Sequence, residues 1–167
     1  MYSHINQAHK DIDLIYWTGD LPPHDIWNQT KEGNLEVLRQ TSQQLRTYFP
    51  DKMILPALGN HESVPVDSFP PPFITGEHSI SWLYSVLDEE WSQWIGAGHS
   101  PTLLYGGYFS VNIGPGLRLI SVNMNYCMNK NFWLLFNSTD PAEELKWLVY
   151  ELQLSEFKGR LIQHKYD

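Results

Sequence analysis

Positive charge is scarce in this 167-residue chain: 11 lysines and arginines stand against 19 aspartates and glutamates, for a formal net charge of −8. Proteins that bind a nucleic-acid backbone normally present a basic face, so we expect no nucleic-acid partner. A phosphate-bearing substrate is compatible with this charge, because bound divalent metals reverse the local field.

Long apolar runs are also missing. No stretch of the sequence approaches the roughly 18 apolar residues that a transmembrane helix needs, so we expect no transmembrane segment. The first residues, Met1 to His4, lack the basic start and apolar stretch of a signal peptide. With 42% hydrophobic and 18% charged residues, the composition is that of a globular protein, and we expect one domain over residues 1–167.

Cysteine is nearly absent, because Cys127 is the only one and therefore has no partner within the chain. Two interpretations stay open. Cys127 is either a buried free thiol or one half of a disulfide whose other half lies outside this sequence. Two glycosylation sequons, which begin at Asn28 and Asn137, favour the second interpretation.

Short apolar runs alternate with segments of helical periodicity. Residues 14–18 and 53–58 are typical of buried strands, and each run is followed by glycine. Apolar residues recur at helical spacing over 35–48 and 83–94, and Asn34 is the predicted N-cap of the first of these helices. This alternation of strands and helices predicts an α/β domain.

The second half of the chain predicts a hairpin and a helix. Residues 108–112 and 117–122 flank a Gly-Pro-Gly turn, which is typical of a β-hairpin. The helix is expected to follow Asp140 as N-cap, with Pro141 in the first helical position and Glu143 completing a capping box. Its predicted buried stripe is Leu145, Leu148, Val149 and Leu152.

Polar residues that suit a metal site follow the two predicted strands. Gly19-Asp20 ends the first strand, and Gly59-Asn60-His61 ends the second. Glycine lets the backbone turn sharply, a carboxylate can bridge two cations, and an asparagine carbonyl adds a neutral oxygen ligand. His61 is placed to donate a proton to a leaving group. Together they suit a two-metal phosphoester site, and two unrelated turns stay open on these motifs alone.

The residues around these motifs resemble the acid sphingomyelinase family, within the calcineurin-like metallophosphoesterases. The resemblance implies an α/β, partial calcineurin-like fold, with layered β-sheets flanked by helices and incomplete at both ends. It also implies a sphingolipid substrate at a membrane surface and a lysosomal or secreted location. It covers about residues 13–153 and is strongest in residues 17–25, 59–63, 68–74, 117–121, 131–135 and 137–141.

The resemblance implies a role for each candidate site residue. Asp20 would bridge two zinc ions, Asn60 would ligate one of them, and His61 would donate the proton to the departing ceramide oxygen. His24 matches a histidine beside the site, for which the resemblance implies a supporting role with the substrate phosphate; a loop position without catalytic duty also stays open.

Two further positions match modified residues of the family. Cys127 matches a cysteine that pairs with a partner further along the family's chain. Asn137 matches a glycosylated position, whereas Asn28 is supported by its sequon alone.

Much of the family's metal site has no counterpart in this sequence. The family has an earlier Asp-x-His motif and later histidine motifs, and His164 stands near one of these without matching it. Zinc generally needs three or more protein ligands, so we expect Asp20 and Asn60 alone to bind metal weakly and the chain to have little or no activity. A sphingomyelin hydrolase, a related nucleotide phosphodiesterase and a non-catalytic product all stay open.

The aromatic content, which includes seven tryptophans, invites a lipid-facing interpretation. Trp82, Trp91 and Trp94 lie in one predicted helical region and are the candidates for such a patch. Aromatic side chains at helical spacing are more often packed in a core, and we expect that here.

Overall fold

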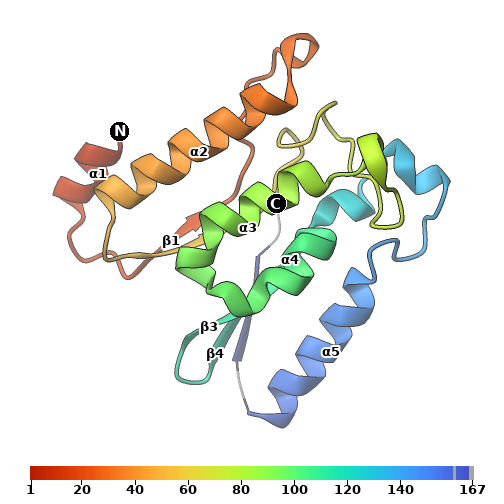
Figure 1. Ribbon diagram of the computed structural model, residues 1–167. Coiled ribbons are helices and arrows are strands. Elements are labelled where there is room, and N and C mark those ends of the chain that lie inside the picture. The colour runs from red at the N-terminus through yellow and green to blue at the C-terminus, as the bar shows by residue number, and fades with distance from the viewer. Residues whose placement is uncertain (160, 166–167) are drawn as a thin grey trace.

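The computed structural model describes residues 1–159 and 161–165, and the side chains of residues 1–159. The chain is a mixed α/β protein in which helices surround two small sheets (Figure 1). The helices and strands are α1 Tyr2–Ala8, β1 Leu14–Trp17, α2 Lys31–Tyr48, β2 Met53–Pro56, α3 Ser81–Ile95, α4 Ser100–Gly106, β3 Phe109–Gly114, β4 Leu117–Ser121, α5 Glu144–Phe157 and β5 Leu161–Lys165.

The first sheet pairs the two strands predicted from the first half of the chain. β1 and β2 run parallel, with Leu14 opposite Met53 and Trp17 opposite Pro56. Parallel neighbours need a crossover connection, and α2 supplies it. Just past the strands, the amide of Ala57 donates to the carbonyl of Trp17 at 2.8 Å. The loops that follow the two strands therefore start side by side at one edge of the sheet.

The second sheet has the order β3-β4-β5. The predicted hairpin is confirmed, because β3 and β4 pair antiparallel, with a bulge between Asn112 and Gly114. β5 pairs parallel with β4. The hydroxyl of Ser121, at the end of β4, donates to the carbonyl of Pro56, at the end of β2. This contact joins the two sheets near the loops that follow β1 and β2.

The core lies mainly under α3, which crosses the centre of the molecule in Figure 1. The rings of Trp17 and Trp91 meet edge to face at 5.8 Å, and Trp91 is only 1% exposed. Trp82 and Trp94 are half-buried and pack against this core. The helical tryptophans are therefore core residues, as expected, and not a lipid-facing patch.

The start of α2 differs from the prediction. Thr30 is the N-cap, because its hydroxyl oxygen accepts a hydrogen bond from the amide of Gly33 at 3.0 Å. Asn34, the predicted cap, lies inside the first turn and is buried. Both residue types cap helices well, so the preference for threonine depends on a tertiary contact that Asn34 makes instead.

The start of α5 also differs from the prediction. The helix begins at Glu144 rather than at Pro141. Asp140 does act as the capping side chain, since its carboxylate accepts hydrogen bonds from the amides of Leu145 (2.9 Å) and Lys146 (3.0 Å). Glu143 has a positive φ of 52° and pairs with the Lys146 ammonium, so the predicted capping box is wrong.

The predicted buried stripe of α5 is wrong as well. Leu145 is 49% exposed and Val149 is 53% exposed, while Leu148 and Leu152 are half-buried. The buried face is polar instead and consists of Glu144, Glu151 and Ser155. Polar partners on the second sheet determine which face of α5 is buried. The Glu151 carboxylate accepts hydrogen bonds from the Arg118 guanidinium at 2.6 Å and from the Ser110 hydroxyl at 3.1 Å.

Candidate functional site

Two glycine loops meet backbone to backbone at the edge of the first sheet. Gly19 has a φ of +84°, and a Cβ there would lie 2.5 Å from the nitrogen of Gly59 and 2.6 Å from the carbonyl oxygen of Ala57. A Cβ at Gly59 would lie 2.6 Å from the nitrogen of Asp20 and 2.8 Å from its Oδ1. Side chains at either position would push the loops apart, so both glycines are required for the close approach.

This contact brings the two predicted metal ligands to one cavity. Asp20 and Asn60 both line a cavity of about 360 Å³. The Oδ1 of Asp20 accepts a hydrogen bond from the amide of His61 at 3.1 Å. The Nδ2 of Asn60 donates to the Asp67 carboxylate at 2.8 Å, which fixes the orientation of the Asn60 amide. The prediction that these residues lie together is therefore consistent with the structure, and their role as ligands stays a prediction.

Glu62 holds the two loops to each other, a role that the sequence did not reveal. Its buried carboxylate accepts hydrogen bonds from the amides of Leu21 and Gly59, both at 2.8 Å. Desolvation by burial raises the pKa of Glu62, and these amide donors oppose that shift. One side chain therefore links the loop after β1 to the loop after β2. The only signal in the sequence was its position directly after Gly59-Asn60-His61.

The two candidate catalytic histidines are brought together. The ring centroids of His24 and His61 are 4.4 Å apart and the rings are tilted by 41°. His24 is exposed, whereas His61 is buried. The Nδ1 atom of His61 is buried and has no hydrogen-bond partner among the described residues. Neither histidine lines the cavity that contains Asp20 and Asn60, although His61 directly follows Asn60 in the chain. The catalytic role of both histidines stays a prediction.

Asn34 fastens the His61 turn to α2. Its Nδ2 faces three consecutive carbonyl oxygens, those of His61 (3.0 Å), Glu62 (3.1 Å) and Ser63 (3.4 Å). These contacts cross 27 to 29 positions of sequence, so helical periodicity did not reveal them. They explain why Asn34 turns away from the helix start.

We expect Asn34→Leu to reduce the free energy of unfolding by about 1–3 kcal/mol, because buried carbonyl oxygens would lose their donor. Equilibrium urea denaturation measures this change. Gln40→Leu on the exposed face of the same helix is the matched control, and its effect should stay within about 0.5 kcal/mol. Equal effects for the two variants would contradict the proposed role of Asn34.

A buried set of asparagines supports the second loop from below. The Nδ2 of Asn125 donates to the carbonyl of Gly59 at 3.3 Å and to the Oδ1 of Asn123 at 2.9 Å. Asn131 in turn donates to the carbonyl of Asn125 at 3.0 Å. The segment after β4 therefore forms one wall of the cavity. Single asparagines in a loop carry no pattern, and the sequence did not single them out.

Cys127 lines the same cavity as Asp20 and Asn60. Its thiol is free and exposed, so the interpretation as a buried thiol is wrong. Partial desolvation raises the pKa of the Cys127 thiol, and the negative charges of Glu144 and Asp140 add to this shift. The thiol therefore favours its protonated form. Its pairing with a cysteine outside this sequence stays a prediction.

The sequons lie away from the core. Asn28 is exposed, and Asn137 is half-buried, with its side-chain oxygen accepting a hydrogen bond from the amide of Thr139 at 3.0 Å. Glycosylation at both positions stays a prediction. The backbone of His164 belongs to β5, but its side chain lies outside the described residues.

The residues that could hold metal form part of a site. Asp20 and Asn60 offer two oxygen ligands to one cavity, which suits divalent cations. Within residues 1–159, no group of three or more His, Cys, Asp or Glu side chains is arranged to hold a metal ion. Among the described residues, Asp20 and Asn60 thus suit two of the ligands of a metal centre, and their role stays a prediction.

The family model of the calcineurin-like phosphoesterases matches residues 1–158. The chain therefore belongs to the calcineurin-like phosphoesterase family, whose members use metal ions, as the name metallophosphoesterase indicates.

Among its relatives, a sphingomyelin phosphodiesterase from Homo sapiens is 51% identical over 148 residues, which cover 89% of this chain and 24% of that protein. Sphingomyelin phosphodiesterase B from Dictyostelium discoideum is 42% identical over 165 residues, 97% of this chain and 25% of that protein. A cyclic GMP-AMP phosphodiesterase from Mus musculus is 32% identical over 157 residues, 92% of this chain and 34% of that protein. The chain spans about a quarter of the length of the sphingomyelin phosphodiesterases that it matches.

None of the helices within the described residues is long and apolar enough to cross a membrane.

Proposed function

We propose that this chain is the part of a sphingomyelin phosphodiesterase that supplies Asp20, Asn60 and His61 to the active site. The reaction would be hydrolysis of the phosphodiester of sphingomyelin to ceramide and phosphocholine. The observation that carries the proposal is the locked pair of glycine loops, which brings Asp20 and Asn60 to one cavity. The similarity to sphingomyelin phosphodiesterases supports the choice of substrate.

Each residue has a proposed task in that reaction. The Asp20 carboxylate and the Asn60 carbonyl would be ligands to zinc. Zinc bound there would neutralise charge at the phosphate and make the attacking water more acidic. His61 would protonate the departing ceramide oxygen from a ring held against His24, and His24 would support the orientation of His61.

The wider setting is also proposed by relationship. The two sheets and their helices would form part of the layered calcineurin-like fold. The resemblance supports a lysosomal or secreted location, in which Asn28 and Asn137 would carry glycans. In such a setting Cys127, exposed at the cavity, is accessible to a disulfide partner.

Turnover by the purified chain tests this function. We expect no turnover of sphingomyelin without added metal, because two oxygen ligands retain zinc weakly. Little activity is expected from a chain with two metal ligands, so excess zinc and detergent-dispersed sphingomyelin should give only slow phosphocholine release, which should still exceed the hydrolysis of cyclic GMP-AMP under the same conditions. Chelator and Asp20→Ala should each abolish it.

Three outcomes would contradict the proposal. Faster hydrolysis of the cyclic dinucleotide would favour the nucleotide-directed alternative that the Mus musculus relative suggests. Phosphocholine release that survives chelator or Asp20→Ala would show that the candidate site does not catalyse the reaction. No turnover of either substrate at saturating zinc would favour a non-catalytic chain.

A further inference from the structure

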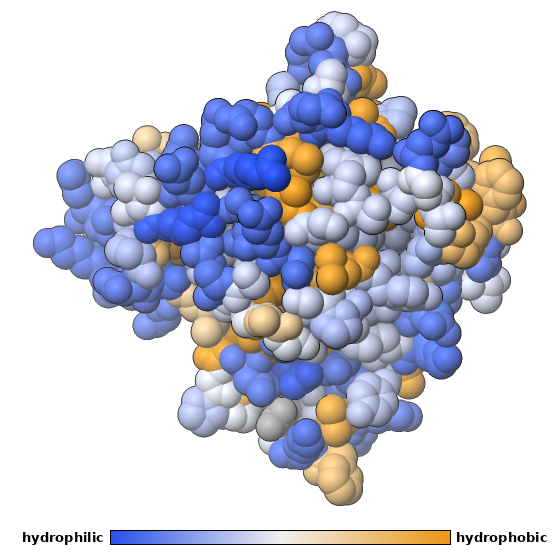
Figure 2. Space-filling view, viewed as in Figure 1, coloured by the Kyte–Doolittle hydropathy of each residue, from blue (hydrophilic) through white to orange (hydrophobic). Residues whose placement is uncertain are grey.

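Three large apolar side chains stand in solvent on one short segment. Phe132, Leu135 and Phe136 are 77%, 85% and 76% exposed, and we call them the 132–136 patch. Hydrophobic surface gathers at the right-hand edge of Figure 2, over the part of the molecule where this segment runs in Figure 1. Single exposed apolar residues are ordinary, but a contiguous group marks a surface that binds a partner or a membrane.

The segment that carries the patch is held rigidly from beneath. The indole Nε1 of Trp133 donates to the Ser68 hydroxyl at 2.9 Å. Asn131, which is 2% exposed, donates to the carbonyl of Phe69 at 2.9 Å and accepts from the amide of the same residue at 3.3 Å. The patch residues are therefore presented outward by an anchored short helix, Phe132–Leu135, and are not a loosely folded tail.

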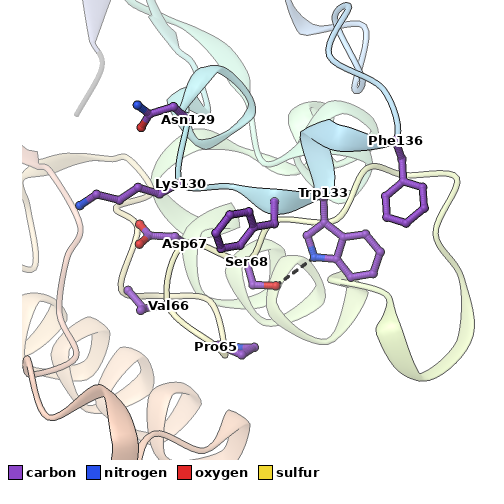
Figure 3. A pocket seen from close by; sticks show the side chains of 9 residues that line it. Pro65, Val66, Asp67, Ser68, Asn129, Lys130, Trp133 and Phe136 are labelled. Carbon is purple, nitrogen blue, oxygen red and sulfur yellow. Dashed lines mark hydrogen bonds between the residues drawn. The ribbon is translucent and has the colours of Figure 1, made fainter.

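A cavity of about 780 Å³ opens beside the patch, large enough for part of an amphipathic ligand. Figure 3 shows that its two ends differ. Asp67 and Lys130 lie at one end, and the aromatic rings of Trp133 and Phe136 lie at the other. The cavity thus offers one carboxylate and one ammonium group next to an apolar wall.

The polar end of this cavity borders the candidate active site. Asp67 accepts the hydrogen bond from the side-chain amide of Asn60. Met128 lines the cavity that contains Asp20, and the next residue, Asn129, lines the cavity beside the patch. A surface that rests on the patch would therefore lie next to the site.

The charges select the kind of surface. The chain as a whole carries −8, which repels an anionic membrane. The cavity beside the patch carries one group of each sign, Asp67 and Lys130, which complements a headgroup with one positive and one negative charge. Exposed phenylalanine and leucine next to such polar groups suit the boundary between headgroups and acyl chains.

We propose that the 132–136 patch inserts into the surface of a zwitterionic phospholipid bilayer and sets the Asp67–Lys130 end of the cavity at the level of the headgroups. This inference rests on the proposed function for its purpose, since a bilayer held there would present lipid substrate to Asp20 and Asn60. Its physical basis, exposed apolar side chains on a rigid support, is independent of turnover.

Vesicle binding by the 167-residue chain tests the proposal without any reaction. The chain is mixed with phosphatidylcholine vesicles that lack sphingomyelin, in the presence of chelator, and the bound fraction is measured by sedimentation. Phe132→Ser, Leu135→Ser and Phe136→Ser are combined in one variant. The matched control combines Leu145→Ser, Val149→Ser and Tyr150→Ser on α5, whose side chains are 49%, 53% and 59% exposed.

We expect the patch variant to lose at least about tenfold in vesicle affinity, because burying each of these side chains contributes favourably to partitioning. The α5 variant should bind like the unmodified chain. Binding should change little between low and high salt and should be weaker on anionic vesicles. Unchanged thermal unfolding of both variants would show that the fold is intact.

Other outcomes would overturn the proposal. Equal binding by the patch variant and the unmodified chain, or loss of binding in the α5 variant alone, would place the contact elsewhere. Tighter binding to anionic vesicles would contradict the charge argument. If the chain does not bind vesicles but self-associates through the 132–136 patch, the patch is a protein-contact surface and not a membrane-binding one. Failure of sphingomyelin turnover in detergent, with vesicle binding intact, would contradict the proposed function and leave this inference standing.

Discussion

Gly19→Ala is expected to lower the free energy of unfolding by about 2–5 kcal/mol and to disrupt the cavity that holds Asp20 and Asn60. The φ of +84° at Gly19 costs an alanine about 1–2 kcal/mol. The new Cβ would also lie 2.5 Å from the nitrogen of Gly59 and 2.6 Å from the oxygen of Ala57. Those are backbone atoms, so relief requires the two loops to separate, which adds about 1–3 kcal/mol.

Gly116→Ala is the matched control for that experiment. Gly116 also has a positive φ, of +72°, but no atom of the described residues lies within 4 Å of the position of its Cβ. Urea denaturation of both variants should therefore show the conformational cost alone at Gly116 and a larger loss at Gly19. Equal losses would mean that the contact between the two loops is not tight, and would remove the main structural argument for the site.

Stability is expected to decrease as the pH rises from about 4.5 to 8, chiefly because of Glu144. Desolvation by burial raises the pKa of Glu144 from 4.5 to about 8. The backbone amide of Asn123, which donates a hydrogen bond to Glu144, opposes this shift, and the charge of Asp140 adds to it. The folded chain thus keeps a proton that the unfolded chain has lost. The stabilisation is fully present below pH 4.5 and is lost as the pH rises through the folded-state pKa.

Glu144 alone contributes at most about 1.4 kcal/mol per pH unit to the slope, the value for one proton. Burial also raises the pKa of Glu62, which acts in the same direction. Glu144→Gln keeps an acceptor for Asn123 and removes the ionisation, so it should flatten most of the slope and raise the melting temperature at pH 8. Glu143→Gln, at the exposed neighbouring position, should change neither. Thermal unfolding at several pH values measures both, and a flat profile in the unmodified chain would contradict the assignment to Glu144.

The elements that the sequence predicted well are those with local signals. Apolar runs followed by glycine correctly marked β1 and β2, and the Gly-Pro-Gly turn marked the hairpin. The same local signal placed Asp20 and Asn60 at the ends of paired parallel strands. A single crossover through α2 sets the two strands parallel, so the loops that follow them meet at one edge of the sheet.

The elements that the sequence predicted badly depend on contacts between distant residues. The leucines and valine of α5 form a regular stripe in the sequence. Glu151 nevertheless faces inward, because its carboxylate forms an ion pair with Arg118 on β4, 33 positions away along the chain. A pairing of this kind overrides hydrophobic periodicity. The roles of Asn34 and Glu62 were missed for the same reason, since Asn34 binds the carbonyl of His61, 27 positions away, and Glu62 binds the amide of Leu21, 41 positions away. Periodicity reports which residues are apolar, but not which polar residues find partners inside.

The most direct test of the central claim, that this chain carries the Asp20–Asn60 part of a metal site, is a zinc titration followed by NMR of the backbone and side-chain amides. We expect selective shifts at Asp20 and at residues 59–61, with the side-chain amide of Asn60 included, and no such shifts in Asp20→Ala. The affinity should be weak, with a Kd on the order of 10 µM to 0.1 mM, because two ligands supply about half of the roughly 10–16 kcal/mol of a four-ligand zinc site. Shifts confined to other residues would contradict the placement of the site, and tight retention of two zinc ions would contradict the claim that these residues form only part of it.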